Sequence, residues 1–238
     1  YFLYSWPGGL PVEYRTMDVP TELMRDENYG ADKLYLVEQV DWRNNYKGND
    51  LTGAAYVGGN FTFGRFNAYA GVRYEYYRMN LTSNTRKAEE SPEDNIYNYN
   101  DLFPSVNMAY RFDDRHVLRL YYGRSVNRPE FRELSTSVYY DFDLASNIQG
   151  NYDLRPAYID NIDLGYSFYP SSGELLSVSL FYKHFRDPIE WTYTVAGGTD
   201  LIYSYLNAKG ADNYGVEVDI RKSLDFIGLP DFSLNVNG

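Results

Sequence analysis

The segment NIDLGYSFYPSSGELLSVSLFYKHF, from Asn161 to Phe185, alternates apolar and polar residues on both sides of a short interruption. Before the interruption the apolar positions are Ile162, Leu164, Tyr166 and Phe168, and after it they are Leu176, Val178, Leu180 and Tyr182. A period of two predicts β-strands with one apolar and one polar face. The interruption, PSSG at residues 170–173, supplies turn-forming residues. The segment is therefore predicted to be an antiparallel hairpin.

The same pattern recurs along the chain, with short turns predicted at residues 62–65, at 113–115 and near 228–230. It indicates about eight strands. Long polar segments separate the hairpins, at residues 83–101, 125–156 and 187–212. Short turns at one end and long loops at the other are typical of outer-membrane barrels, whereas a soluble sandwich does not segregate loop lengths in this way. The expected fold is all-β, an antiparallel transmembrane β-barrel with short periplasmic turns and long extracellular loops.

The two faces of the predicted strands differ in chemistry. Leu118, Leu120, Val216 and Val218 belong to the apolar face, and Arg119, Glu217 and Asp219 belong to the polar face. We expect the apolar face to contact lipid and the polar face to line the lumen. Because unpaired backbone groups cannot face hydrocarbon, the barrel must close, and eight strands can close alone.

The polar face also carries glycines and charges. The glycines are Gly71, Gly123, Gly165 and Gly215. Barrel curvature and packing against an interior plug would each explain them. The charged residues are Arg73, Glu75, Arg111, Arg119, Glu217, Asp219 and Arg221. They predict either an ionic network in the lumen or ordinary solvation.

Composition excludes several classes of function. The 238 residues carry a net charge of -11, which argues against nucleic acid as a partner. The chain has no Cys, so it has neither disulfides nor thiolate metal sites. Its two histidines, His116 and His184, are far apart in sequence, which argues against a His-based metal site or a catalytic triad. No stretch approaches the 18 apolar residues of a transmembrane helix.

Longer motifs carry a family resemblance. Residues 127–170 contain NRPEFREL, a loop with YYDF, a GN…L.P element and a strand that opens NIDLGY. This segment resembles the TonB-dependent outer-membrane receptors, especially the Bacteroidetes-type ones. Residues 204–224 and 26–56 resemble further loop-to-strand junctions of such receptors. Tyr152 departs from the pattern, because a proline usually follows GN there.

The resemblance implies a domain organisation and a function. A receptor barrel of this family has about 22 strands, so residues 1–238 would be a partial barrel domain, with 1–50 mainly extracellular loop and the plug domain absent. The implied function is TonB-energised import of a large nutrient such as a siderophore or a glycan, with no enzymatic activity and no cofactor. The implied partners are outer-membrane lipid, the protein's own plug domain, the TonB complex through that plug, and a surface lipoprotein. Cobalamin and peptides also stay open as cargo.

Two other functions remain as alternatives. One is a self-contained small outer-membrane barrel with a structural or adhesion role. The other is a soluble β-sandwich, either an enzyme or a carbohydrate-binding module.

Ligand-binding candidates lie in the long loops, where aromatic side chains are available as binding anchors. They are Tyr139, Tyr140, Trp191 and Tyr193. Packing among neighbouring loops is the alternative role for these four. Two acidic groups are candidates for cation sites: the run of Glu89, Glu90, Glu93 and Asp94, and the pair Asp141 and Asp143. For both groups a solvated loop is favoured, and no catalytic, cofactor-binding or metal-ligating residue is predicted.

Overall fold

The computed structural model describes residues 2–30, 32–38, 45–84, 93–197 and 200–238. The chain divides into two compact units, Tyr1–Asn45 and Tyr46–Gly238. Each unit is described by itself below.

The first unit is built around a short antiparallel ribbon of β1 (Phe2–Ser5) and β2 (Tyr35–Glu38). Between these strands lie three single helical turns, η1 (Val12–Tyr14), η2 (Val19–Leu23) and η3 (Asp26–Asn28). Leu23, Leu34 and Asn28 are buried, and the Asn28 amide donates to the carbonyl oxygens of Glu22 and Leu23 at 3.0 and 3.1 Å. Short ordered elements thus lie within residues 2–38, and the first strand of the second unit begins at Tyr46.

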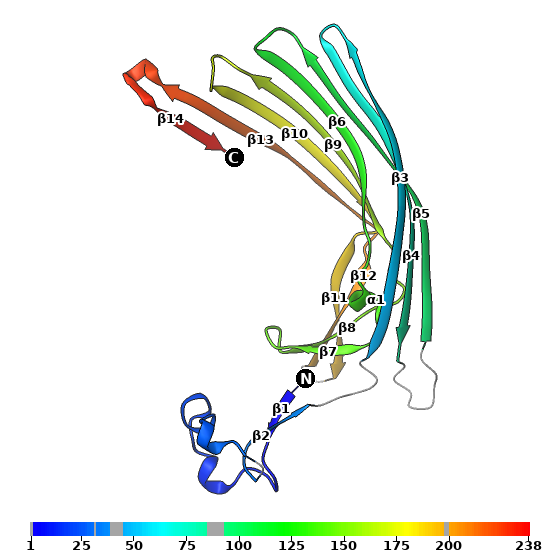
Figure 1. The fold of residues 1–238 in the computed structure, drawn as a ribbon, viewed down its shortest axis with the longest axis vertical. Coiled ribbons are helices and arrows are strands. Elements are labelled where there is room, and N and C mark those ends of the chain that lie inside the picture. Colours follow the sequence, from blue (N-terminus) through cyan, green and yellow to red (C-terminus); the bar gives the residue numbers. More distant parts are fainter. Residues whose placement is uncertain (1, 31, 39–44, 85–92, 198–199) are drawn as a thin grey trace. The chain divides into compact units, whose positions relative to one another are not determined.

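The second unit contains one eight-stranded sheet, in the order β14-β13-β10-β9-β6-β5-β4-β3 (Figure 1). Its strands are β3 (Tyr46–Phe63), β4 (Phe66–Ser83), β5 (Glu93–Arg111), β6 (His116–Asn127), β9 (Ala157–Phe168), β10 (Leu175–Arg186), β13 (Gly210–Leu224) and β14 (Leu229–Asn237). All neighbours are antiparallel and follow one another along the sheet in chain order. The predicted all-β antiparallel fold is confirmed. Within the described residues β3 and β14 are the two edge strands, so this sheet is open. The sheet is also curved (Figure 1).

The turns at one end of the sheet are short, as predicted. β3 and β4 are joined by Gly64 and Arg65 alone, and Gly64 has a φ of 57°, a left-handed conformation that glycine adopts freely. The turn at residues 170–173 also lies where it was predicted, and Gly173 has a φ of 83°. The last turn includes the 3-10 turn η5 (Asp225–Ile227).

The prediction of a long polar segment between hairpins at residues 83–101 is wrong in its extent. β4 continues to Ser83 and β5 begins at Glu93, so most of that segment is strand. Its polar composition is misleading because this end of the β4–β5 hairpin extends beyond the part of the sheet that carries the outward apolar side chains. Here Thr82 donates to Asp94 at 2.6 Å across the pair.

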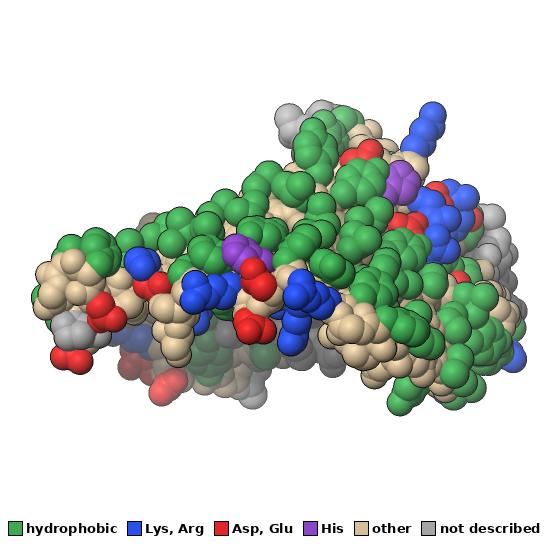
Figure 2. All heavy atoms as spheres, turned by 90° about the horizontal axis from the view of Figure 1, so that it is seen from above, with side chains coloured by type: hydrophobic (Ala, Val, Ile, Leu, Met, Phe, Trp, Pro, Cys, Tyr) green, Lys and Arg blue, Asp and Glu red, His purple; other side chains and the backbone are tan. Residues whose placement is uncertain are grey.

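Register places the apolar positions of successive strands side by side. Met108, Leu120, Leu164, Leu180 and Val216 form one continuous row across β5, β6, β9, β10 and β13. Leu120 is 37% exposed and Val216 is 59% exposed, although both are aliphatic. Figure 2 shows hydrophobic side chains in a broad area that is bordered by charged side chains. The predicted apolar face is therefore continuous, and in the described parts of the chain no helix has the length and apolarity needed to cross a membrane.

The other face of the sheet is concave and carries the polar set together with a row of aromatic rings that lie over glycines. A Cβ added at Gly58 or Gly71 would overlap the Tyr69 ring, one at Gly123 would overlap Tyr121, and one at Gly215 would overlap Phe181. Tyr121 and Phe181 are both level with Asp163, so these rings share one row. Glycine is required here by rings of the same sheet, a reason that neither sequence-based explanation contained.

Candidate ligand-binding site on the long loops

The two long loops together build a second, smaller sheet, which we call the loop sheet. Residues 128–156 supply β7 (Val138–Asp141) and β8 (Ser146–Gln149), and residues 187–209 supply β11 (Ile189–Gly197) and β12 (Asp200–Asn207). The strand order is β11-β12-β8-β7, and β8 and β12 pair in parallel through Asn147 with Ile202 and Ile148 with Tyr203. Two loops far apart in sequence therefore form one unit, which lies on the concave side of the large sheet (Figure 1).

Side chains also join the two loops. The Asn151 amide donates to the carbonyl oxygen of Tyr205 at 2.9 Å. Asn207 accepts from the Arg155 backbone N–H at 2.8 Å and donates to the Arg155 carbonyl oxygen at 2.9 Å. Arg155 forms an ion pair with Asp187 at 2.7 Å. These contacts satisfy backbone groups that the short strands leave unpaired.

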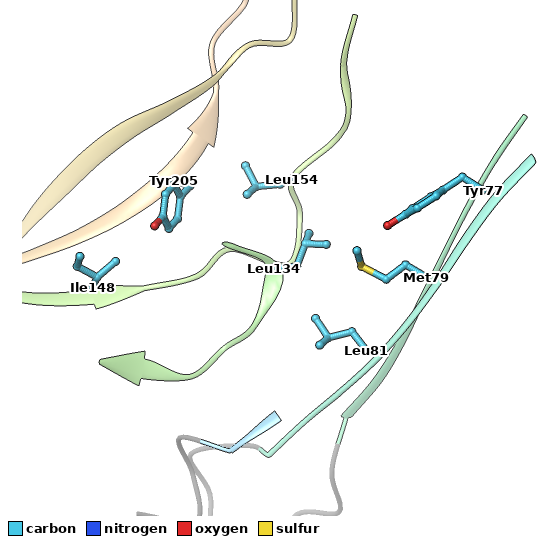
Figure 3. Packing of buried hydrophobic residues seen from close by; sticks show 7 residues of the cluster. All are labelled: Tyr77, Met79, Leu81, Leu134, Ile148, Leu154 and Tyr205. Carbon is cyan, nitrogen blue, oxygen red and sulfur yellow. The ribbon is translucent and has the colours of Figure 1, made fainter. Parts of the chain in front are cut away.

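A hydrophobic cluster packs the loop sheet against β4. Tyr77, Met79 and Leu81 come from the concave face of β4, and Leu134, Ile148, Leu154 and Tyr205 come from the loops (Figure 3). Ile148 and Leu81 are 0% and 1% exposed. Burying one such side chain contributes about 1.5–3 kcal/mol, so the cluster holds the loops in a defined position.

Gly150 and Asn151, the two residues of the GN element, make close backbone contacts beside this cluster. Gly150 lies so close to the carbonyl oxygens of Arg132, Glu133 and Ser135 that no Cβ would fit. The next residue, Asn151, donates its backbone N–H to the Glu133 carbonyl at 2.6 Å. The GN element that carried the family resemblance is therefore a close crossing of two backbone segments, and Tyr152 after it is 46% exposed.

Arg128, from the NRPEFREL motif, connects the first loop to two strands. Its guanidinium forms ion pairs with Glu75 of β4 at 3.0 Å and Asp101 of β5 at 2.8 Å, and lies 4.6 Å from the centre of the Tyr77 ring. The side chains of Arg128, Glu75 and Asp101 are 16%, 13% and 8% exposed. Arg73 also pairs with Glu75 at 2.7 Å. Of the charged residues expected on the polar face, Arg73 and Glu75 thus belong to an ionic network, while Arg119 instead donates to Ser167 at 2.9 Å.

The α-helical turn α1 (Phe131–Leu134) follows directly. Glu130 and Glu133 form a reciprocal capping box, in which the Glu130 backbone N–H donates to Glu133 at 2.9 Å. This turn brings Leu134 into the hydrophobic cluster.

Two of the four predicted ligand-binding residues lie on an exposed aromatic surface. Trp191 and Tyr193 of β11 are 53% and 61% exposed. Tyr203 of β12 lies between them, with ring centres 6.0 Å from Trp191 and 6.1 Å from Tyr193. We call these three residues the aromatic strip. The strip continues into the cluster, because Trp191 is also 5.0 Å from the buried Tyr205 ring.

The third predicted residue, Tyr139, is partly buried and packs against the hydrophobic cluster. Its hydroxyl lies 3.4 Å from that of Tyr205, and the Arg132 guanidinium lies 4.4 Å from its ring centre. Burial, and then the hydrogen bond with Tyr139, raise the pKa of the Tyr205 hydroxyl well above its usual value. Both observations indicate a structural contact between the loops.

The fourth predicted residue, Tyr140, points to the opposite face of the loop sheet from Tyr139. It is 42% exposed and its ring meets Phe142 edge-on at 5.1 Å. The sequence reasoning overlooked Phe142, which is 78% exposed, and did not select Tyr203. The alternation W-T-Y in β11 and Y-S-Y in β12 contained the signal for Tyr203, because it places the rings on one face of a hairpin.

The acidic groups have ordinary structural roles where they are described. Asp141 accepts the backbone N–H groups of Asp143 and Leu144, both at 2.9 Å, and so forms the β7–β8 turn. Glu89 and Glu90 lie outside the described residues. Among the residues that the structure describes, no group of three or more His, Cys, Asp or Glu side chains is placed to hold a metal ion.

Residues 21–237 match the model of the outer membrane protein beta-barrel family. The chain belongs to this family, which places it in the bacterial outer membrane. No curated protein sequence matches the chain.

Solved structures of outer-membrane receptors share the fold. The hemophore receptor HasR of Serratia marcescens, solved as a double mutant with its hemophore HasA and heme, has a TM-score of 0.62 and 17% identity over 79% of this chain. The siderophore receptor PirA of Pseudomonas aeruginosa has a TM-score of 0.55 and 16% identity over 81% of this chain. The matches cover 34% and 42% of those two chains, so this chain spans well under half of their length.

Proposed function

We propose that this chain is part of the barrel of a TonB-dependent receptor that imports a large nutrient across the outer membrane. The loops capture the nutrient, and a plug domain driven by the TonB complex admits it. The motifs in residues 127–170 favour the Bacteroidetes-type branch, in which a surface lipoprotein assists capture. The role is transport and not catalysis.

One observation carries the proposal. The loop sheet is packed in place by the cluster of Tyr77, Leu81, Leu134 and Ile148, yet Trp191 and Tyr193 of its aromatic strip are left exposed to solvent. Rigid loops bearing exposed Trp and Tyr side chains are typical of binding sites, because little conformational entropy is lost when a ligand covers them. A loop that only had to fold on itself would bury these rings.

The nutrient is proposed by class only. The similar structures are a hemophore receptor and a siderophore receptor. We propose a cargo of comparable or larger size with ring surfaces, an iron chelate, a heme or a glycan, that stacks on Trp191 and Tyr193.

The test uses the whole receptor and compares the exposed pair, Trp191 and Tyr193, with the partly buried Tyr139. Replacing Trp191 and Tyr193 together by Ala is expected to weaken cell-surface binding and uptake of the nutrient at least tenfold, because a well-packed aromatic anchor contributes about 2 kcal/mol or more. Replacing Tyr139 by Ala is expected to disturb the loop sheet first, seen as faster hydrogen exchange in β7 and β8.

Tyr214→Ala is the matched control, because Tyr214 is 77% exposed on the apolar face of β13, on the opposite face of the large sheet from the loop sheet. Uptake that continues unchanged in the Trp191/Tyr193 variant would rule out the strip as the capture site. Uptake that persists without a proton gradient would contradict the energised mechanism.

A further inference from the structure

The concave face of the large sheet carries a row of side chains that runs directly across its strands. Register aligns Asn60 of β3, Tyr69 of β4, Asn107 of β5, Tyr121 of β6, Asp163 of β9 and Phe181 of β10. We call these residues the wall row. From β4 to β10 an aromatic ring lies on every second strand, and a polar side chain lies on each strand between. The proposed capture step on the loops does not use them.

The aromatic rings of the wall row are held against the sheet. No Cβ separates the backbone from the ring of Tyr69 at Gly71, or from the ring of Tyr121 at Gly123. Each ring therefore rests on the wall and turns its other face to the lumen, and Tyr69 and Tyr121 are both 37% exposed. Because the rings are already fixed in this position, little conformational entropy is lost when a ligand covers them.

The polar side chains between the rings are available to a ligand. Within the described residues, no hydrogen bond or ion pair engages the Asn107 amide or the Asp163 carboxylate. Asn60, Tyr69 and Asn107 also border one hollow of the concave wall, so amide groups and an aromatic ring share a single surface there. Amides and carboxylates hydrogen-bond to hydroxyl groups, and the wall row therefore offers both stacking and hydrogen bonding.

The spacing of the wall row fits a chain-like ligand. Because neighbouring strands lie about 4.8 Å apart, rings on alternate strands are about 10 Å apart. Barrel strands tilt by about 35–45° from the barrel axis, so a line drawn across them runs obliquely and changes depth in the membrane. A single planar ligand such as a heme would cover one of these rings, whereas a ligand with repeated ring-shaped units would cover all three.

We propose that the wall row is a stacking path for a linear glycan on its way through the barrel. Each sugar unit has an apolar C–H face that packs on an aromatic ring, and a hydroxyl edge that hydrogen-bonds to polar groups. The alternation of rings with Asn107 and Asp163 matches this alternation of faces and edges. The inference rests on the proposed transport function, and among the cargo classes named there it selects the glycan.

Uptake by cells that carry the whole receptor tests the path. The probes are labelled linear glucans, mannans and fructans, each as a disaccharide and as a hexasaccharide. The changes Tyr69→Leu, Tyr121→Leu and Phe181→Leu together keep an apolar side chain over each glycine but remove the rings. We expect uptake of the hexasaccharide to fall about tenfold, equivalent to about 1.4 kcal/mol, while cell-surface binding by Trp191 and Tyr193 stays unchanged. Uptake of the disaccharide, which reaches fewer rings, should fall less.

Tyr110→Leu is the matched control, because Tyr110 is 41% exposed on the outward face of β5. An equal loss of uptake in this control would overturn the proposal. So would unchanged uptake of the hexasaccharide by the triple variant.

Cross-linking identifies what covers the wall row. Tyr121 is replaced by the photoreactive residue benzoylphenylalanine in the whole receptor, and we expect it to cross-link to the labelled hexasaccharide during uptake. Cross-links to the plug domain alone, or to nothing, would overturn the proposal. Import of an iron chelate but of none of the glycans would overturn this inference and leave the proposed function standing. No energised import of any nutrient would overturn both.

Discussion

The large sheet and the loop sheet belong to one compact unit, but they place their apolar side chains in opposite ways. The large sheet leaves them outward, where Tyr214 is 77% and Val216 is 59% exposed, and continuous backbone ladders hold its strands together. The loop sheet directs part of its apolar side chains into a core, where Ile148 is 0% exposed. The difference shows that the two regions are built for two solvents. Lipid covers the first, and the second must form a core of its own in water.

We expect the largest effect when Arg128, the cation that connects the loops to the large sheet, is removed. Arg128→Met leaves the buried Asp101 without a cationic partner and Glu75 with Arg73 alone, and we expect the docked loops to lose about 3–5 kcal/mol of stability. Hydrogen exchange of residues 128–156 in the whole receptor measures the loss. Adding Glu75→Gln and Asp101→Asn should restore much of it, and an equally unstable triple variant would contradict the electrostatic explanation.

A charge placed on the lipid side tests the other half of the contrast. Leu120→Arg is expected to destabilise the inserted receptor by about 2–4 kcal/mol, because the charge enters hydrocarbon. Asn107→Arg, on the concave face of β5, is expected to change stability by about 0.5 kcal/mol or less. Urea unfolding of the receptor in lipid vesicles compares the two, and similar losses would show that the faces are assigned incorrectly.

Backbone crowding in the loop sheet gives a smaller effect. Gly150→Ala forces a methyl group against the Ser135 carbonyl and should cost about 1–3 kcal/mol. Gly53 of β3 is the control, because an added Cβ there meets nothing within 4 Å. Protease resistance of residues 128–156 reports the effect. A Gly150 variant as resistant as the Gly53 variant would mean that the crossing can relax.

The smallest effect concerns acidity at the short turns. A hydrogen bond from Lys222, at 2.5 Å, lowers the pKa of the Glu174 carboxyl below its ordinary value of 4.5. A depressed pKa stabilises the fold above the unfolded value, and this contribution is lost as the pH falls through the folded pKa. Glu174→Gln should therefore weaken the protein at pH values above 4.5 and make no difference once the pH is below the folded pKa of Glu174. A constant difference across the acid range would exclude the ion pair as the cause.

Sequence alone predicted the large sheet well, because a period of two is a local signal and the segment 161–185 repeats it on both sides of a short turn. It failed between residues 83 and 101, because Asp94, Asn98 and Asn100 interrupt the apolar parity of β5 and the pattern no longer distinguishes strand from loop. The loop sheet was not predictable, since the parallel pair of β8 and β12 joins residues more than fifty positions apart. For the same reason sequence alone could not separate Tyr139, which packs inside, from Trp191, which does not.

The glycines beneath Tyr69, Tyr121 and Phe181 have a consequence for the proposed transport function as well as for folding. Because each ring lies flat along the concave wall, the bore of the barrel at this level is set by the backbone and not by the length of the side chains. A bulkier residue at Gly123 would lift Tyr121 away from the wall and narrow the passage. Under the proposed transport function, these small residues would therefore limit the size of the cargo although they touch no ligand.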